Sequence, residues 1–166
     1  MNYEIVELEE FTGLKAKVYS VIPEGDTLSL FDHFVGENMG IYRPEVKSII
    51  NRLHEIGHRT GAREKFFKTK EGFPGDGVCA LYDDKDSKLR LYCIRYGSVA
   101  IILGGGGPKP PGIIAWQDDE KLSKEAEAII QVSKDIMLRL KDGDLYWSSD
   151  GSQLSGNLIF TNDGNE

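Results

Sequence analysis

The chain has 166 residues, of which 40% are hydrophobic and 28% are charged, which is typical of one globular domain with a core of its own. The formal net charge of −7 argues against a nucleic-acid-binding surface spread over the whole molecule. No apolar run approaches the roughly 20 residues of a membrane-spanning helix, and the acidic start of the chain differs from a signal peptide. We therefore expect a cytoplasmic protein with no membrane partner.

The first third of the chain predicts strands followed by two helices. Residues 3–8 indicate a strand, and residues 15–22 suit either a second strand or a loop. Thr27 is a candidate cap for a short helix. The inner face of that helix would carry Leu28, Phe31, Phe34 and Val35. Pro44 suits the first turn of a second helix, which Gly57 would end. Together these helices predict a hairpin lying on a sheet.

The middle of the chain predicts that sheet. Residues 76–82, 89–96 and 99–103 are three short apolar segments joined by tight polar turns, the pattern of an antiparallel meander. Residues 104–112, rich in glycine and proline, predict a loop.

The last third predicts a long helix and a short hairpin. Asp118 or Asp119 is a candidate cap for the helix, and Gly143 would end it. Residues 145–147 and 158–160 would then pair. The fold class is therefore α+β, with one domain over residues 1–160 and a disordered tail at 161–166.

Charge is distributed unevenly along the chain. Residues 1–40 and 116–166 each carry a net charge of −6, whereas residues 41–115 carry +5. The segment 59–72 alone holds five basic residues, two acidic residues and the pair Phe66 and Phe67. Such asymmetry suggests an anionic partner, although basic side chains also decorate ordinary solvated faces. The two phenylalanines are better explained as core residues than as rings that stack on bases.

The segment 89–96 is the most informative strand. Because residues two apart share a face of a strand, Arg90, Tyr92 and Tyr96 should lie together, opposite the apolar residues, on a face polar enough to meet a partner. Arg95 falls on the apolar side near the end of the strand. A cross-strand pair between Arg90 and an acid such as Asp83 or Asp84 is an equally good explanation of this arginine.

Other motifs carry little chemistry. The run Gly104–Lys109 lacks the helix-opening pattern of a phosphate-binding loop. His54 and His58 have no third ligand nearby in the sequence, so no metal site is expected. Cys79 and Cys93 lie in apolar segments, where cysteine usually acts as a small hydrophobic residue.

The order of these parts is distinctive. A helical hairpin leads into the basic stretch 63–68, then into the strands at 75–82 and 88–97 with a central arginine, then into residues 99–109 and a helix that reaches Leu140. This order resembles the RelE/ParE/HigB superfamily of type II toxin–antitoxin toxins. The resemblance covers about residues 41–140, with 1–40 and 141–160 as additions. It implies a RelE-like α+β fold: an antiparallel meander packed with an N-terminal helical hairpin and a C-terminal helix.

The resemblance also implies an activity, that of a ribosome-dependent endoribonuclease that cuts mRNA through its own 2′-hydroxyl and needs no metal or cofactor. Such chemistry requires a base, a cation beside the phosphate and an acid. Arg90 matches the arginine that stabilises the phosphate. Lys65 and Lys68 match positions at which a base or an electrostatic role is expected. Lys109 matches a further cation, and Tyr92 matches an acid or a ring that stacks on a base. The expected RNA-binding residues are Arg59, Arg63, Lys70 and Arg95. The implied partners are a cognate antitoxin, mRNA and the ribosome.

Two alternatives stay open on the sequence. The acidic flanks and the absence of an evident acid/base pair suit a non-catalytic RelE-like module that binds a helix-turn-helix regulator. A small-ligand or structural α+β domain with no nucleic-acid role is the third interpretation. The first interpretation, the ribonuclease toxin, expects Arg90, Lys68 and Lys109 to converge. Their scatter over different faces would favour the third interpretation.

Overall fold

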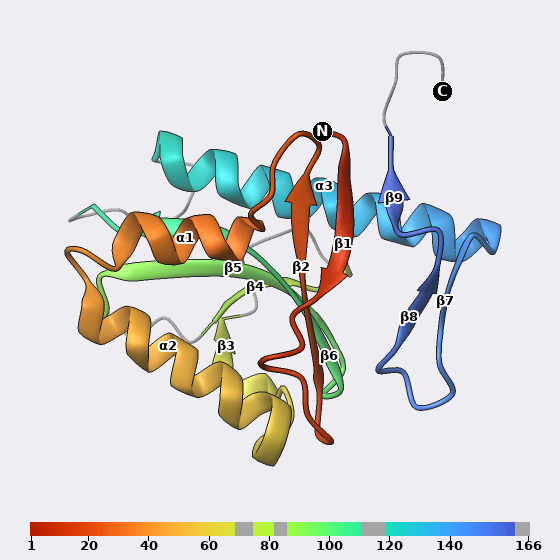
Figure 1. Cartoon of the computed structure of the whole chain (residues 1–166), viewed down its shortest axis with the longest axis horizontal. Coiled ribbons are helices and arrows are strands. Elements are labelled where there is room, and N and C mark those ends of the chain that lie inside the picture. The colour runs from red at the N-terminus through yellow and green to blue at the C-terminus, as the bar shows by residue number, and fades with distance from the viewer. Residues whose placement is uncertain (69–74, 82–85, 111–118, 162–166) are drawn as a thin grey trace.

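A seven-stranded sheet with the order β3-β4-β5-β6-β2-β1-β9 organises the chain (Figure 1). The computed structural model describes residues 1–68, 75–81, 86–110 and 119–161. Within them the strands of this sheet are β1 (Tyr3–Glu7), β2 (Lys17–Pro23), β3 (Phe67–Lys68), β4 (Val78–Leu81), β5 (Leu89–Tyr96), β6 (Ala100–Pro108) and β9 (Ile159–Phe160). All neighbouring strands pair antiparallel except β2 and β6, which are parallel. The predicted meander is therefore present as β4, β5 and β6.

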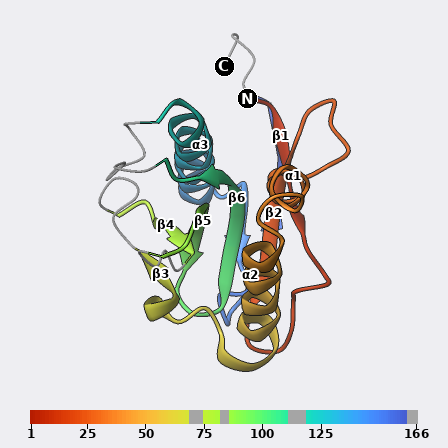
Figure 2. The same cartoon turned by 90° about the vertical axis from the view of Figure 1, so that its left-hand side faces the viewer.

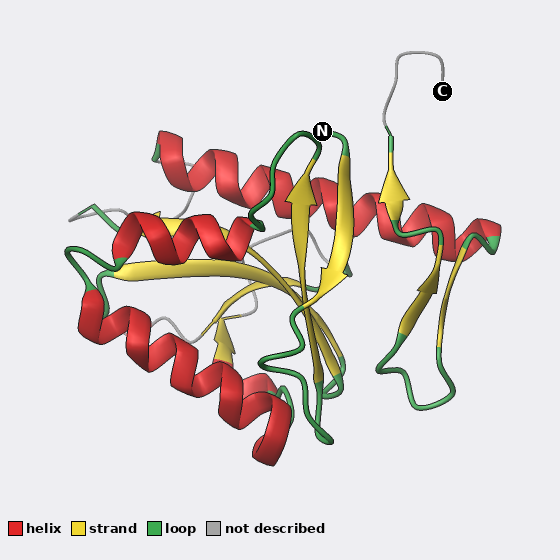
Figure 3. Ribbon diagram, viewed as in Figure 1, coloured by secondary structure: helices red, strands yellow, loops and turns green. Residues whose placement is uncertain are grey.

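Three α-helices pack on the sheet within the described residues: α1 (Leu30–Asn38), α2 (Arg43–Glu55) and α3 (Glu120–Asp142). In the side view the α1–α2 pair and α3 lie on opposite sides of β6 (Figure 2). Two separate hydrophobic clusters correspond to these two layers, one beneath α3 and one beneath α1 and α2. The predicted α+β class is confirmed at this level, with a mostly antiparallel sheet (Figure 3).

Helix ends follow local chemistry. Ser29, rather than Thr27, caps α1, because its hydroxyl accepts from the Asp32 amide while the Asp32 carboxylate accepts from the Ser29 amide. Leu28 consequently lies outside the helix and is exposed, which corrects its expected place on the inner face. Asp119 caps α3, and Gly143 ends it in the left-handed conformation at φ 80°.

The second helix does not end at Gly57 as the sequence suggested. A wide helical turn over Ile56–Thr60 continues α2, and Gly61 ends it at φ 75°. Gly57 is glycine for another reason: a Cβ there would lie 1.7 Å from the Phe11 carbonyl oxygen. The chain approaches this helix too closely to admit any side chain.

Two further expectations are corrected. Strand β6 runs through the four glycines to Pro108, where a loop was predicted from residue 104; residues 111 and 112 of that loop lie outside the described part. The hairpin near the C-terminus pairs β7 (Leu145–Trp147) with β8 (Leu154–Gly156), whereas Ile159–Phe160 pairs with β1 and forms the edge of the main sheet. Of the expected disordered tail, residues 162–166 lie outside the described residues.

No helix in the described part of the chain is both long enough and apolar enough to cross a membrane. Residues 1–40, treated above as an addition, supply β1, β2 and α1, so they are part of the main sheet and its first helical layer.

Candidate functional site

Strand β5 has the two faces that its sequence predicts. Tyr92 and Tyr96 belong to the α3 side, and Leu89, Leu91 and Cys93 belong to the side of α1 and α2. The α3 side is not open, however: Arg90 is 3% exposed and Tyr92 is 0% exposed. The expectation that this face meets a partner directly is wrong, because a helix docks along it.

Arg90 is the only charged side chain classed as buried among the described residues. Its strand partner is Gly107 in β6, and a Cβ at Gly107 would lie 3.4 Å from the Lys121 side chain of α3. Arg90 therefore lies under the first turns of α3. Because arginine is almost never fully buried unless it is paired, this position stands out from the rest of the core.

The four glycines of β6 allow close packing of backbones. A Cβ at Gly106 would lie 1.8 Å from the Arg90 carbonyl oxygen, and one at Gly105 would lie 2.2 Å from a Glu125 carboxylate oxygen. The pairing between β5 and β6 also shifts register between Leu91 and Cys93, as at a β-bulge. These glycines are thus explained by sterics within the fold, with no ligand required.

Lys68 shares the face of Arg90. It pairs with Ala80 in β4, and Ala80 pairs with Tyr92 in β5, so all three lie in one row on the α3 side. From strand spacing and rise, the Cα atoms of Lys68 and Arg90 are about 12 Å apart. Lys68 is exposed, in contrast to Arg90. The two cations are on one side of the sheet and within the span of two long side chains.

Lys65 lies elsewhere. Its Nζ is 5.7 Å from the centre of the Phe66 ring, and the Arg52 guanidinium of α2 lies 4.4 Å from the same centre. Phe66 and Phe67 are buried in the cluster beneath α1 and α2, as predicted for core residues. Lys65 is therefore grouped with α2 and not with Lys68 and Arg90.

Lys109 lies at the end of β6, where its Nζ donates to the Ser87 hydroxyl at 3.1 Å. Beside Ser87, the Lys88 amide donates to a carboxylate oxygen of Glu45 in α2 at 2.5 Å. Lys109 thus belongs to a cluster that extends toward α2. The three cations do not meet at one point: Lys68 and Arg90 share a face, and Lys109 lies with Ser87. The convergence expected of the toxin is therefore only partial.

The expected RNA-binding arginines have local roles as well. Arg59 pairs with Glu55 at 3.4 Å, and the Arg63 Nε donates to the Thr60 carbonyl at 3.3 Å. Arg95 donates to the Ala62 carbonyl at 2.7 Å, which ties the segment after α2 to the end of β5. Arg59 and Arg63 stay exposed. Lys70, and the acids Asp83 and Asp84, lie outside the described residues.

Neither a metal centre nor a reactive thiol emerges from the described residues. No group of three or more potential ligands forms among them. Cys79 and Cys93 face each other across β4 and β5, with 3.5 Å between their sulfur atoms, and both are buried and free. Burial raises the pKa of the Cys93 thiol, which keeps it protonated and unreactive.

No family model matches the chain, and no curated protein or solved structure matches it either.

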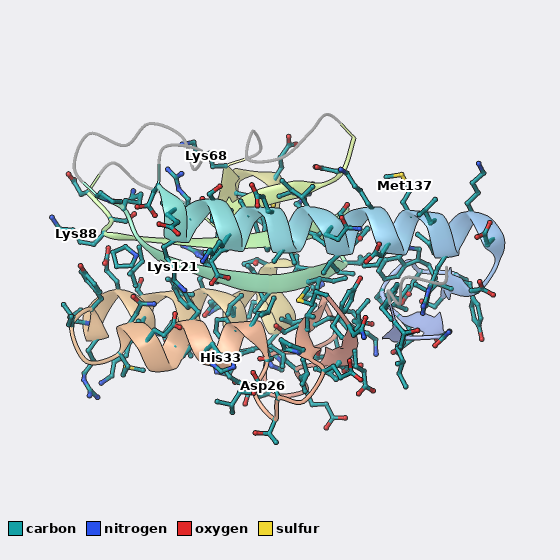
Figure 4. All side chains as sticks on the ribbon, turned by 90° about the horizontal axis from the view of Figure 1, so that it is seen from above. Asp26, His33, Lys68, Lys88, Lys121 and Met137 are labelled. Atoms are coloured by element: carbon teal, nitrogen blue, oxygen red, sulfur yellow. The ribbon has the colours of Figure 1, made fainter. Side chains whose placement is uncertain are left out.

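Charge is segregated between the two edges of the sheet. Residues 43–68, which form α2, its extension and β3, carry a net charge of +4, whereas residues 1–40 carry −6. Because β3 and β1 are separated by four strands, the two charges lie toward opposite edges. Figure 4 shows Lys68 and the pair Asp26–His33 on opposite sides of the molecule. We call residues 43–68 the basic edge.

Sequence reasoning missed Glu45 and Ser87. Glu45 is an ordinary acid in the first turn of a helix, and Ser87 is an ordinary residue before a strand. Only the packing of α2 on β5 brings them together, so no local pattern would have found them.

Proposed function

We propose that this chain is a RelE-like toxin that acts on RNA, most simply as a metal-independent endoribonuclease on translating ribosomes. The observation that supports this proposal is the basic edge, which includes the exposed Lys68, carries a net charge of +4 and lies away from the acidic strand β1. Lys and Arg side chains on one surface neutralise phosphates and so bind RNA. An acidic protein can bind RNA in this way where part of its negative charge, here that of the strands in residues 1–40, lies toward the other edge.

Supporting geometry comes from the α3 side of the sheet. Lys68 is exposed at the rim and Arg90 lies about two residues further along, beneath the start of α3. A cation held in a protected site stabilises developing charge on a phosphate better than one in water. In this proposal Lys68 contacts the substrate, and Arg90 supplies fixed positive charge behind it.

Induced expression in a bacterial host tests the proposal. The wild type should arrest growth, and Lys68→Ala should relieve the arrest, because it removes the exposed cation from the rim. Lys124→Ala is the matched control, since Lys124 is an exposed lysine of α3 whose ion pair in the described part of the chain is a 3.8 Å contact with Glu120. Normal growth with abundant, folded wild-type protein would contradict the proposal.

A second candidate is a non-catalytic RelE-like module that binds a helix-turn-helix regulator. It is favoured by the burial of Arg90 and Tyr92, which leaves fewer accessible groups for chemistry than the resemblance implies. This module would bind its partner yet leave RNA intact. Incubation with translating ribosomes separates the two functions, because only the toxin shortens the mRNA.

A further inference from the structure

A cavity of about 270 Å³ lies between α2 and the sheet, on the side away from Arg90. Its walls are mostly apolar and include Ile49 of α2 and Leu81, Leu89 and Leu91 of β4 and β5. Its polar groups include the carboxylate of Glu45 and the hydroxyl of Ser87. A concave apolar site with a few polar groups is the usual form of a small-ligand site. The volume of this cavity is just below the usual range of roughly 300–1,000 Å³ for such sites, so the cavity suits a single flat ring system.

The carboxylate of Glu45 is only partly satisfied. One oxygen accepts from the Lys88 amide, whereas the other is buried and has no hydrogen-bond partner among the described residues. A buried carboxylate oxygen without a donor is costly, and most such atoms in folded proteins are paired. The missing partner is a donor, so a ligand that fills the cavity should carry N–H or O–H groups toward Glu45.

Two lysines lie close to the Ser87 wall of the cavity. Lys109 donates to Ser87, and Lys88 is exposed next to it; Figure 4 shows Lys88 near the end of the molecule where α3 begins. A phosphate attached to the buried ring would meet these lysines. A nucleotide combines hydrogen-bond donors on a flat ring with a phosphate.

We propose that this cavity binds guanine, as a nucleotide or within single-stranded RNA, through Glu45. Guanine carries two neighbouring N–H donors on its pairing edge, which match the two oxygens of one carboxylate. Adenine and cytosine each place an acceptor beside their amino group, and uracil flanks its N–H with two carbonyls, so each would set an acceptor against the carboxylate. Single-stranded RNA is read along this edge. The cavity would select a base at the basic edge, to which Glu45 and Ile49 belong, so the inference rests on the proposed RNA function.

A nitrogen-15 NMR titration of the full chain with GMP tests the site directly. The Lys88 amide is the reporter, because its N–H is bonded to Glu45, and Trp147 on the other side of the sheet is the reference. GMP should shift the Lys88 signal and leave Trp147 unchanged, and UMP should bind at least about tenfold more weakly. A short RNA containing one guanine should bind more tightly than GMP, with an affinity that falls as salt rises.

Two variants make the test specific. Glu45→Gln keeps the shape and an acceptor for Lys88 but turns a donor toward the ligand, so GMP should bind about 10- to 100-fold more weakly. Ile49→Phe fills the cavity and should weaken both GMP and the RNA. Glu55→Gln, at the other end of α2 and half exposed, is the matched control and should bind as the wild type does.

Three results would overturn the inference: no shift of Lys88 at roughly 10 mM GMP, equal binding of GMP and UMP, or undiminished binding by Glu45→Gln. The growth assay is independent of these results. Growth arrest without GMP binding overturns the guanine site alone, whereas GMP binding by a chain that does not arrest growth supports the site and overturns the proposed toxin.

Discussion

Replacement of Gly106 by alanine should be among the most damaging single-methyl changes in the sheet. The new Cβ would lie 1.8 Å from the Arg90 carbonyl oxygen, 2.8 Å from its carbon and 3.0 Å from the Leu91 Cα, whereas ordinary carbon contacts are about 3.5–4.0 Å. All three atoms are backbone of the paired strand, so no rotamer change can relieve the clash. Overpacking costs about 1–3 kcal/mol, and each hydrogen bond lost between β5 and β6 adds about 1 kcal/mol.

We therefore expect Gly106→Ala to lower the free energy of unfolding by about 3–5 kcal/mol. Urea unfolding followed by circular dichroism measures this change. Gly107→Ala is the matched control in the same strand, because its nearest neighbours are flexible atoms of Lys121 at 3.4 and 3.5 Å. Gly36→Ala, in α1 with nothing within 4 Å, should stabilise the fold by up to about 1 kcal/mol.

The result that would refute this reasoning is a Gly106→Ala protein within about 1 kcal/mol of the wild type. The glycine run would then not be required by the approach of β5 to β6. A role for these glycines in contact with a ligand would have to be reconsidered.

Three further outcomes follow from local chemistry. Ser29→Ala should lower the free energy of unfolding by about 1 kcal/mol through loss of the α1 cap, and Thr27→Ala should leave this free energy unchanged. Equal effects of the two substitutions in urea unfolding would contradict the assignment of Ser29 as the cap. Hydrogen bonds from Ser148 and Ser152 lower the pKa of Asp150 to about 2. The ionised Asp150 carboxylate therefore stabilises the fold at pH values above its ordinary pKa of 3.8. This stabilisation is lost as the pH falls toward 2. Acid unfolding of Asp150→Asn should lack this component, and an unchanged pH profile would count against it. Because Cys93 is buried with a raised pKa, a thiol reagent should label it only after unfolding; rapid labelling of the native protein would disprove its burial.

Much of the fold could be predicted because short-range patterns decide it. Apolar runs separated by polar turns predict β4, β5 and β6, and helical spacing after Pro44 predicts α2. Strand β6 was predicted too short, since four consecutive glycines usually indicate a loop. Their real cause is the approach of Arg90 and α3, a tertiary contact that leaves no local signature.

The candidate site was predictable only in part, for the same reason. Alternation along β5 places Arg90 and Tyr92 on one face, and the structure agrees. The burial of that face depends on where α3 docks, which the helix's own sequence does not specify. The convergence of Glu45 with Ser87 likewise requires α2 to cross the start of β5, because the two residues are 42 positions apart in the sequence.

Cleavage of mRNA on translating ribosomes tests the central proposal most directly. Purified wild-type protein should shorten the message, Lys68→Ala should slow cleavage about 100-fold as expected for loss of a charge-stabilising group, and Lys124→Ala should cleave at the wild-type rate. Absence of cleavage by folded wild-type protein, or cleavage at full rate by Lys68→Ala, would contradict the account.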